Sequence, residues 1–480
     1  MRTASRLATS TPARVAAASF GVAFTARWLT IQRLTPMPSG DGYDRLAHTD
    51  RLVVHDWLPA YQALLDALAL VSRAPDWLRG GNAALGALAA ALFSLLVTAE
   101  LGAAAGLAAG LGVALSPVHG LTATGLYQEP LFVLLVCGAL VTLAHRPALA
   151  VTLIAAASLT RYEGWLLAAI GGLYLWWAPR PARRARGAAL ALMAAPAAWL
   201  AWRTWGSGPP LGSWLEPSIA PDRWLEQAHL WGRLLPYWVG WPTVALAAVG
   251  AGLLLRDARG GRPPGVATGC LLLLGAADLA FLTILRPFSP PDNNRQLHLP
   301  VLVLLRLAAR VVVVAPEGRW RWAAAALVAV ALSGPPLRGW LESEPDPLVR
   351  RAHAAAGMLP PMREGAAVLV LDPGAERYPG GIPSACATVL AYARLPRDRV
   401  WCDADVPSLS PGELRGWLLA RHATSVVWPD PSAVDLPLHQ QVQEAWDAGD
   451  LERVGNAPAG SLEGAWPAES AAPVVLRVRE

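Results

Sequence analysis

Long apolar runs alternate with short polar segments through most of the chain. They lie near residues 15–31, 81–98, 101–118, 125–144, 147–160, 162–178, 187–205, 237–255, 266–285, 297–315 and 321–337. A helix needs about 20 mostly apolar residues to cross a bilayer, so the pattern predicts about 11 transmembrane helices. The chain is therefore expected to be an α-helical polytopic membrane protein.

Arginines between the apolar runs indicate how these helices are oriented. Cytoplasmic loops are enriched in basic residues, which predicts a cytoplasmic N-terminus. The loops then expected inside hold Arg146, Arg180, Arg183, Arg184, Arg186, Arg256, Arg259, Arg262, Arg319 and Arg321. With an odd number of spans, residues from about 340 onward lie outside, together with loops 32–80, 206–236 and 286–296.

Two of these outside loops contain apolar residues at helical spacing. In residues 222–235, Trp224, Ala228, Trp231 and Leu235 recur at helical spacing, and residues 61–71 carry one apolar face after Pro59. A helix with a single apolar face lies in the membrane interface. We expect two interfacial helices, the alternative for residues 222–235 being a loop with tryptophan anchors.

The apolar pattern ends near residue 340, where a Pro-rich and charged tail begins. Short β-like runs lie at 366–371, 424–428 and 474–478, with a helical stretch at 411–422. The tail is therefore predicted to form a small extracytoplasmic α/β domain over 340–480, following a membrane domain over 1–339.

The four cysteines divide between these two parts. Cys137 and Cys270 lie inside apolar runs and are expected to be buried thiols. Cys386 and Cys402 lie in the tail, where an extracytoplasmic location permits a disulfide. Two separate buried thiols are an equal alternative.

Composition excludes an ordinary soluble enzyme. The 480 residues are 54% hydrophobic and 16% charged, against about 25% charged residues in a typical soluble domain. The net charge is +5, and the basic residues, all arginine, lie between apolar runs rather than along one polar face. The expected surroundings are the lipid bilayer of the cytoplasmic membrane, and nucleic acid is not an expected partner.

Acidic residues follow the first apolar run closely. Asp41 and Asp44 come after Pro36 and Pro38. An aspartate within hydrogen-bond reach of an acceptor hydroxyl can act as a general base, and a second carboxylate can hold a metal or orient the acceptor. The alternative is turn chemistry with solvated charge.

The same outside loop carries further polar candidates. His55 and Asp56 precede the segment that ends at Tyr61. Histidine can bind a metal or accept a proton, and the alternative is an exposed loop position.

Five ionisable residues lie at the expected outer ends of later runs: Glu129, Arg161, Glu163, Arg286 and Arg295. Charged groups at this depth are costly and mark functional sites. Arginine matches phosphate oxygens bidentately, so the three arginines are candidates for binding a lipid-linked phosphate. The alternatives are side chains that extend to the lipid headgroups and, for Arg161, an internal pair with Glu163.

Charged residues also lie deeper within the runs. Arg27 is near the outer end of the first run, and Asp278 is the only acidic residue near the middle of a run. Arg306 and Arg310 lie on the expected cytoplasmic half of their run, where we expect them to extend to the headgroups.

Several short motifs together resemble a known family. These are the acidic loop after the first run, W-x-P-x-Y at 57–61, Glu-Pro at 129–130, TRYEGW at 160–165, Arg-x-x-x-x-Pro at 295–300, and LLARHATSVVWPD at 418–430. The set resembles the polytopic GT-C glycosyltransferases, in a bacterial branch similar to protein O-mannosyltransferases and aminoarabinose transferases. That branch often carries Asp-Glu where this chain has Asp41-Gly42.

The resemblance implies an enzyme that moves a sugar from a polyprenyl-phosphate donor to an acceptor hydroxyl outside the membrane, with inversion at the anomeric carbon. The acceptor is a glycan, a lipid or a protein. The resemblance implies that Asp41 is the base and that Arg295 binds the donor phosphate. It implies no certain cofactor and leaves a divalent metal possible.

Two other functions share these features. A transporter or flippase for a lipid-linked saccharide also needs arginines at the interface, but requires polar residues along several spans. A non-catalytic envelope assembly protein would act through its outside tail and tolerate substitution of Asp41.

Overall fold

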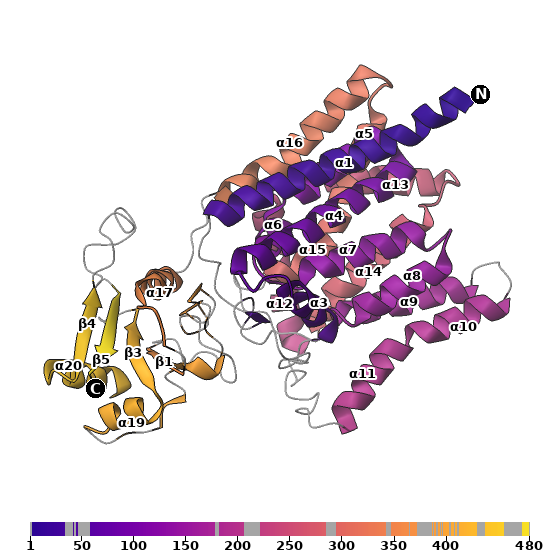
Figure 1. Ribbon diagram of the computed structural model, residues 1–480. Helices are drawn as coiled ribbons and strands as arrows, with labels where there is room; N and C mark the ends of the chain where they lie inside the picture. Colours follow the sequence, from indigo (N-terminus) through magenta and orange to yellow (C-terminus); the bar gives the residue numbers. More distant parts are fainter. Residues whose placement is uncertain are drawn as a thin grey trace. The chain divides into compact units, whose positions relative to one another are not determined.

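The computed structural model describes most of the chain as helix, with one small sheet near the C-terminus (Figure 1). The described residues are 2–33, 42, 45–46, 58–177, 182–205, 221–284, 294–341, 347–363, 365–371, 386, 388–389, 392–393, 395, 397–402, 405–407, 409, 412–429, 437–455 and 473–479. The chain divides into two compact units. The first comprises Met1–Thr30, Trp57–Tyr61 and Gly80–Ser343, and the second Ile31–Asp56, Gln62–Arg79 and Glu344–Glu480.

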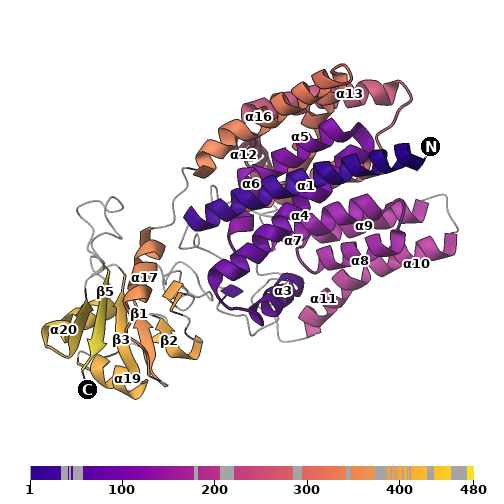
Figure 2. The ribbon, with the colours of Figure 1, turned by 45° about the horizontal axis from the view of Figure 1, so that its top comes forward.

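The helices of the first unit lie side by side in both views (Figures 1 and 2). Gln62–Arg79, which holds most of the helix Pro59–Ala69 and the start of the helix Pro75–Leu101, is grouped with the second unit. The helices from the N-terminus to residue 341 are α1 (Arg2–Arg33), α3 (Pro59–Ala69), α4 (Pro75–Leu101), α5 (Ala103–Ala114), α6 (Pro117–Thr124), α7 (Glu129–Thr142), α8 (Pro147–Ser158), α9 (Glu163–Trp177), α10 (Ala182–Leu192), α11 (Ala194–Trp205), α12 (Pro221–Val239), α13 (Trp241–Arg259), α14 (Val266–Ile284), η2 (Asn294–Leu297), α15 (His298–Ala309), η3 (Arg310–Val314) and α16 (Arg319–Leu341). Each of the eleven predicted runs contains helix. The expected surface segments are also helical, as α3 and α12.

Several of these helices are short or bent. By length and apolar composition, α4 and α14 can each cross a membrane, and up to four spans result among the described residues if each bent pair counts as one. The bends are 53° between α5 and α6, before Pro117, and 108° between α12 and α13, at Gly240. Proline lacks a backbone donor, and Gly240 adopts a φ of 79°, so both positions interrupt the helical ladder. The count of about 11 spans stays a prediction.

Small residues let the helices approach closely. A Cβ atom on Gly110 of α5 would lie 2.7 Å from Ser94 Cβ of α4 and 2.9 Å from Ser19 Cβ of α1. Only glycine fits at such a contact. Association of apolar helices depends on this kind of close packing, because lipid tails are as apolar as leucine.

Ion pairs and a hydrogen bond join helices α4, α13, α14 and α15 at one end of the unit. Arg306 of α15 donates to Glu100 of α4 at 2.6 Å, and the Thr268 amide of α14 donates to the same carboxylate at 3.3 Å. Arg310 pairs with Asp257 of α13. The expectation that Arg306 extends to the headgroups is therefore wrong, because its buried guanidinium pairs with Glu100 of a neighbouring helix. For Arg310, which pairs with Asp257 in the last turn of α13, the expectation stays a prediction.

The second unit contains a five-stranded sheet of order β2-β1-β3-β5-β4. Its strands are β1 (Ala367–Val370), β2 (Val400–Cys402), β3 (Ala423–Trp428), β4 (Leu451–Gly455) and β5 (Val474–Val478), and its helices include α17 (Pro347–Met358), α19 (Leu414–Ala420) and α20 (Pro437–Asp447). Strands β1, β2 and β3 are parallel, whereas β5 is antiparallel to β3 and β4. The three predicted strands, β1, β3 and β5, and the predicted helix, α19, are confirmed. Strands β2 and β4 were not predicted.

Helices cover both faces of this sheet (Figure 2). Alanines of α17 pack on Val368, Val370, Val427 and Val475. Leucines of α19 and Val442 of α20 pack on the opposite face. The result is a three-layer α/β arrangement with two apolar cores.

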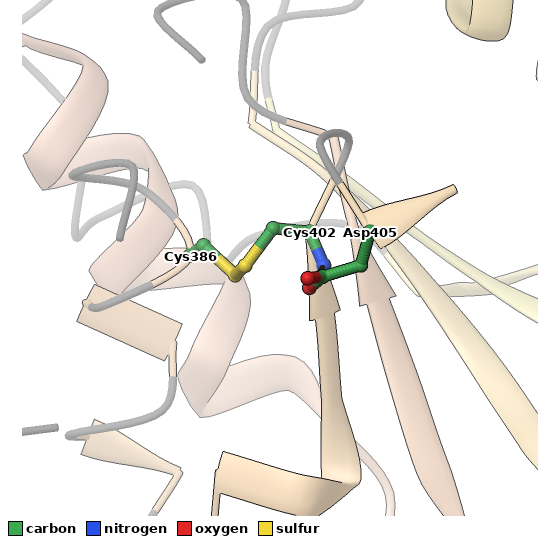
Figure 3. Close-up of a disulfide and its surroundings, with 3 residues drawn as sticks. All are labelled: Cys386, Cys402 and Asp405. Atoms are coloured by element: carbon green, nitrogen blue, oxygen red, sulfur yellow. Dashed lines mark hydrogen bonds between the residues drawn. A yellow bond between two sulfur atoms is a disulfide. The ribbon is translucent and has the colours of Figure 1, made fainter. Parts of the chain in front are cut away.

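A disulfide links Cys386 to Cys402 at the end of edge strand β2 (Figure 3). The Cα atoms lie 5.9 Å apart, and the Cys402 amide donates to the Asp405 carboxylate at 2.8 Å. This bond decides between the two alternatives left open by the sequence. Cys137 and Cys270 are buried free thiols, as expected.

We expect that replacing Cys386 and Cys402 together by alanine lowers the unfolding free energy of the domain by about 3 kcal/mol, because the bond closes a loop of 16 residues. Thermal unfolding of the purified protein measures this. As a control, thiol labelling of the denatured wild type should modify two cysteines without reductant and four after reduction. Four labelled thiols without reductant would contradict the disulfide.

Candidate functional site

The turn between α8 and α9 carries the TRYEGW motif and is tightly held. Ser158 donates to the Gly164 carbonyl at 3.0 Å, and the Trp165 indole donates to the Ser158 carbonyl at 3.0 Å. A Cβ on Gly164 would lie within 2.6 Å of the Ser158 amide nitrogen, so only glycine permits α9 to start here. The Ala60 amide, at the start of α3, donates to the Leu159 carbonyl at 2.9 Å. Two motifs about 100 residues apart thus meet, since buried Tyr61 follows Ala60 directly.

Arg161, in this turn, is buried between two glutamates. Its Nη2 donates to Glu163 Oε1 at 2.6 Å and its Nε to Glu163 Oε2 at 3.1 Å, while Nη1 donates to Glu129. The guanidinium also lies 5.9 Å from the ring centroid of Phe132. Glu129 and Glu163 occupy the first turns of α7 and α9, where the helix dipole stabilises negative charge. All three donor nitrogens are engaged, which favours the internal ion pair over direct phosphate binding.

A third carboxylate acts on the same cluster. Asp278 of α14 is fully buried, and its charge interacts with those of Arg161 and Glu163. Neither Asp278 oxygen has a hydrogen-bond partner among the described residues, and the same holds for Glu129 Oε2. Two carboxylates therefore contact the guanidinium, and a third, that of Asp278, lies within electrostatic range of it. Such a buried excess of negative charge requires a proton, a cation or donated hydrogen bonds.

A second buried polar cluster has the opposite composition. Arg27 of α1 is fully buried and donates from Nη2 to the Val113 carbonyl at 3.4 Å. Within the described part of the chain its Nε and Nη1 have no hydrogen-bond partner. The Arg27 charge acts on His119 of α6, whose Nδ1 lies 3.0 Å from Nδ1 of His298. This cluster holds basic groups and, among the described residues, no paired carboxylate.

The two clusters account for some of the predicted site residues and not for others. Tyr61, Glu129, Arg161 and Glu163 are described, and the last three form one cluster. Arg295 belongs to η2, immediately before α15, but its side chain lies outside the described residues. The remaining predicted residues, Asp41, Asp44, His55, Asp56 and Arg286, also lie outside the described residues.

Sequence reasoning missed the histidine pair. His119 and His298 are 179 residues apart and lie in unrelated segments, so no local signal joins them. The described residues contain no group of three or more His, Cys, Asp or Glu side chains placed to hold a metal ion.

Comparison with solved structures identifies the fold of the chain. The sequence matches no family model and no curated protein. The structure is similar to the crystal structure of ArnT, an aminoarabinose transferase, from Cupriavidus metallidurans in the apo state, with a TM-score of 0.58 and 14% identity over 98% of each chain. It is also similar to the Archaeoglobus fulgidus oligosaccharyltransferase, crystallised with Zn and sulfate, with a TM-score of 0.51 and 13% identity over 87% of this chain and 68% of that one. Both are GT-C glycosyltransferases, and the chain has the GT-C fold.

We expect Arg161→Met to lower the unfolding free energy by about 3–5 kcal/mol, because it leaves two buried glutamates without their cation. The matched control is Arg321→Met, which removes an ion pair with Glu317 that is largely exposed and should change stability little. Thermal unfolding in detergent compares the two. Equal melting temperatures for both variants would show that the Arg161 cluster is not a buried ion pair.

Proposed function

We propose that this protein is a membrane glycosyltransferase that moves a sugar from a polyprenyl-phosphate donor to an acceptor hydroxyl on the extracytoplasmic side. The observation that carries the proposal is the shared fold with ArnT over 98% of both chains, which includes the C-terminal sheet as well as the helices. The buried polar clusters add to it, because ionisable groups among apolar helices mark functional sites.

The proposed reaction is a single displacement with inversion. The acceptor oxygen attacks the anomeric carbon while the bond from that carbon to the phosphate oxygen breaks. Asp41 accepts the hydroxyl proton, and polyprenyl phosphate leaves with the bonding electrons. Asp44 orients the acceptor or holds a divalent metal.

Basic groups stabilise the charge that develops on the leaving phosphate. We assign this role to Arg295 and Arg286, and we add Arg27, whose buried Nε and Nη1 have no described partner. Arg161 differs from these, because its nitrogens already contact Glu129 and Glu163. Its proposed role is therefore to hold the two carboxylates in place beside the donor.

Carboxylates without donors suit a sugar ligand, because sugar hydroxyls are hydrogen-bond donors. Glu129 Oε2 and both Asp278 oxygens meet this description within the described chain. We propose that Glu129 and Glu163, together with Tyr61, His55 and Asp56, contact substrate.

The disulfide supports an extracytoplasmic C-terminal domain. Disulfides persist in oxidising compartments and are rare in the cytosol. Cys386 and Cys402 are both buried, as expected for a structural bond. The proposed topology therefore has a cytoplasmic N-terminus and the tail outside.

The direct test is release of polyprenyl phosphate by the purified protein from a panel of polyprenyl-phosphate sugars and a mixed acceptor extract. We expect Asp41→Asn to reduce release by at least about 100-fold, since general base catalysis contributes that much. Asp398→Asn, an exposed aspartate of the tail, is the control and should release phosphate like wild type. An active Asp41→Asn variant would refute the assignment of Asp41.

The same preparation separates the transferase from the flippase. No release from any donor, together with movement of lipid-linked sugar across reconstituted vesicles, would replace the transferase by the flippase.

A further substitution tests the phosphate role of Arg27. Arg27→Gln should raise the KM for the donor about 10-fold to 100-fold, the equivalent of a lost charged hydrogen bond. Its melting temperature should stay equal or rise, because the substitution removes a buried charge that a carbonyl alone compensates. Arg14→Gln, an exposed arginine of the same helix, is the control for steady-state kinetics. An unchanged KM in Arg27→Gln would exclude Arg27 from the donor site.

A further inference from the structure

A pocket of about 1120 Å³ lies within the C-terminal domain, far in sequence from the residues proposed for catalysis. It is lined by the segment that joins α17 to β1, the turn before β3, and parts of β4 and β5. Its volume is comparable to that of small-molecule sites, which measure about 300–1,000 Å³. The pocket is therefore large enough for a ligand of the size of a sugar.

The sheet changes character where it borders this pocket. Ser425 of β3 pairs in register with Arg477 of β5, which pairs with Glu452 of β4, so the three side chains share one face. Two residues along the strands, Val427 and Val475 on the same face lie in the core beneath α17. This face of the sheet is thus apolar under α17 and polar at the pocket. A polar surface of this kind suits binding of a polar ligand rather than packing of another helix.

Positive charge exceeds negative charge among the described lining residues. Arg363, Arg477 and Arg479 line the pocket with a single carboxylate, that of Glu452. Glu452 lies 3.5 Å from the Nε of Arg479. Arg363 and Arg477 have no ion-pair partner in the part of the chain that the structure describes, so two guanidinium groups are available to an anion.

Two further features sharpen the site. The Oγ atom of Ser425 is buried and has no hydrogen-bond partner among the described residues, although Ser425 lines the pocket. His422 adopts a φ of 54°, which glycine normally occupies at the end of a helix. Its carbonyl accepts the Ala367 amide at 2.8 Å, and its exposed side chain lines the pocket.

We propose that this pocket binds the anionic group of a saccharide, a phosphate or a carboxylate, through Arg363 and Arg477. Guanidinium groups pair bidentately with both anions, and Ser425 and His422 offer hydrogen bonds to adjoining hydroxyls. If the protein transfers sugars as proposed above, the pocket selects an acidic acceptor, and that assignment rests on the proposed function. Binding itself does not depend on it.

The test is calorimetric titration of the full-length protein in detergent with glucose 1-phosphate, glucuronate, inorganic phosphate and neutral glucose. We expect either acidic sugar to bind at least about tenfold more tightly than glucose, and its binding to weaken as salt is raised. The comparison of the two acidic sugars identifies the preferred anion. Tighter binding of inorganic phosphate than of either sugar would show an ion site rather than a saccharide site.

The double variant Arg363→Gln with Arg477→Gln should lose about tenfold or more of this affinity. Arg453→Gln is the matched control, because Arg453 neighbours Glu452 on β4, pairs with Leu476 and therefore lies on the opposite face of the sheet. An unchanged melting temperature and an intact disulfide verify that the double variant and the Arg453→Gln control are folded. The salt dependence is measured on wild type and so does not depend on any variant.

The proposal is overturned if wild type binds no acidic sugar, if glucose binds equally well, or if the double variant binds like wild type. Donor turnover is measured separately on the same samples. Turnover without binding refutes the pocket alone, and binding without turnover refutes the transferase alone.

Discussion

A charge buried among apolar helices must be compensated, and this constraint organises the helical unit. Arg306 and Arg310 are compensated by carboxylates on neighbouring helices, which fixes α4, α13 and α15 at one end. Arg161 is compensated more than once, because two glutamates bind it and Asp278 lies nearby. Arg27 is compensated only by a carbonyl among the described residues. The cluster around Arg161 therefore has an excess of acidic groups, and the cluster around Arg27 an excess of basic groups. Such an excess is expected where a bound polar ligand supplies the compensating groups.

Much of the architecture is readable from local pattern. The apolar runs mark the helices, and the short β-like runs at 366–371, 424–428 and 474–478 mark three of the five strands. Strands β2 and β4 are three and five residues long, and neither stands out from its surroundings. Helix lengths were harder to predict, because the bends at Pro117 and Gly240 depend on how single residues break the hydrogen-bond ladder.

The site was less predictable for a different reason. That Glu129, Arg161 and Glu163 matter follows from their depth among apolar residues, but their mutual contacts depend on the packing of α7 against α8 and α9. An arginine expected to be free for phosphate therefore has its nitrogens occupied by glutamates. The histidine pair shows the same limit, since contact between α6 and α15 is a property of the assembled fold.

The strand order of the C-terminal sheet also constrains how the domain is made. β5 lies between β3 and β4, although it follows both in the chain. β4 has its hydrogen-bonded neighbour in β5 and so cannot join the sheet before β5 has been synthesised. Until then the edge of β3 stays open to other chains. Completion of the sheet therefore waits for β5, and until β5 is in place the open edge of β3 is a site for misassembly with other chains.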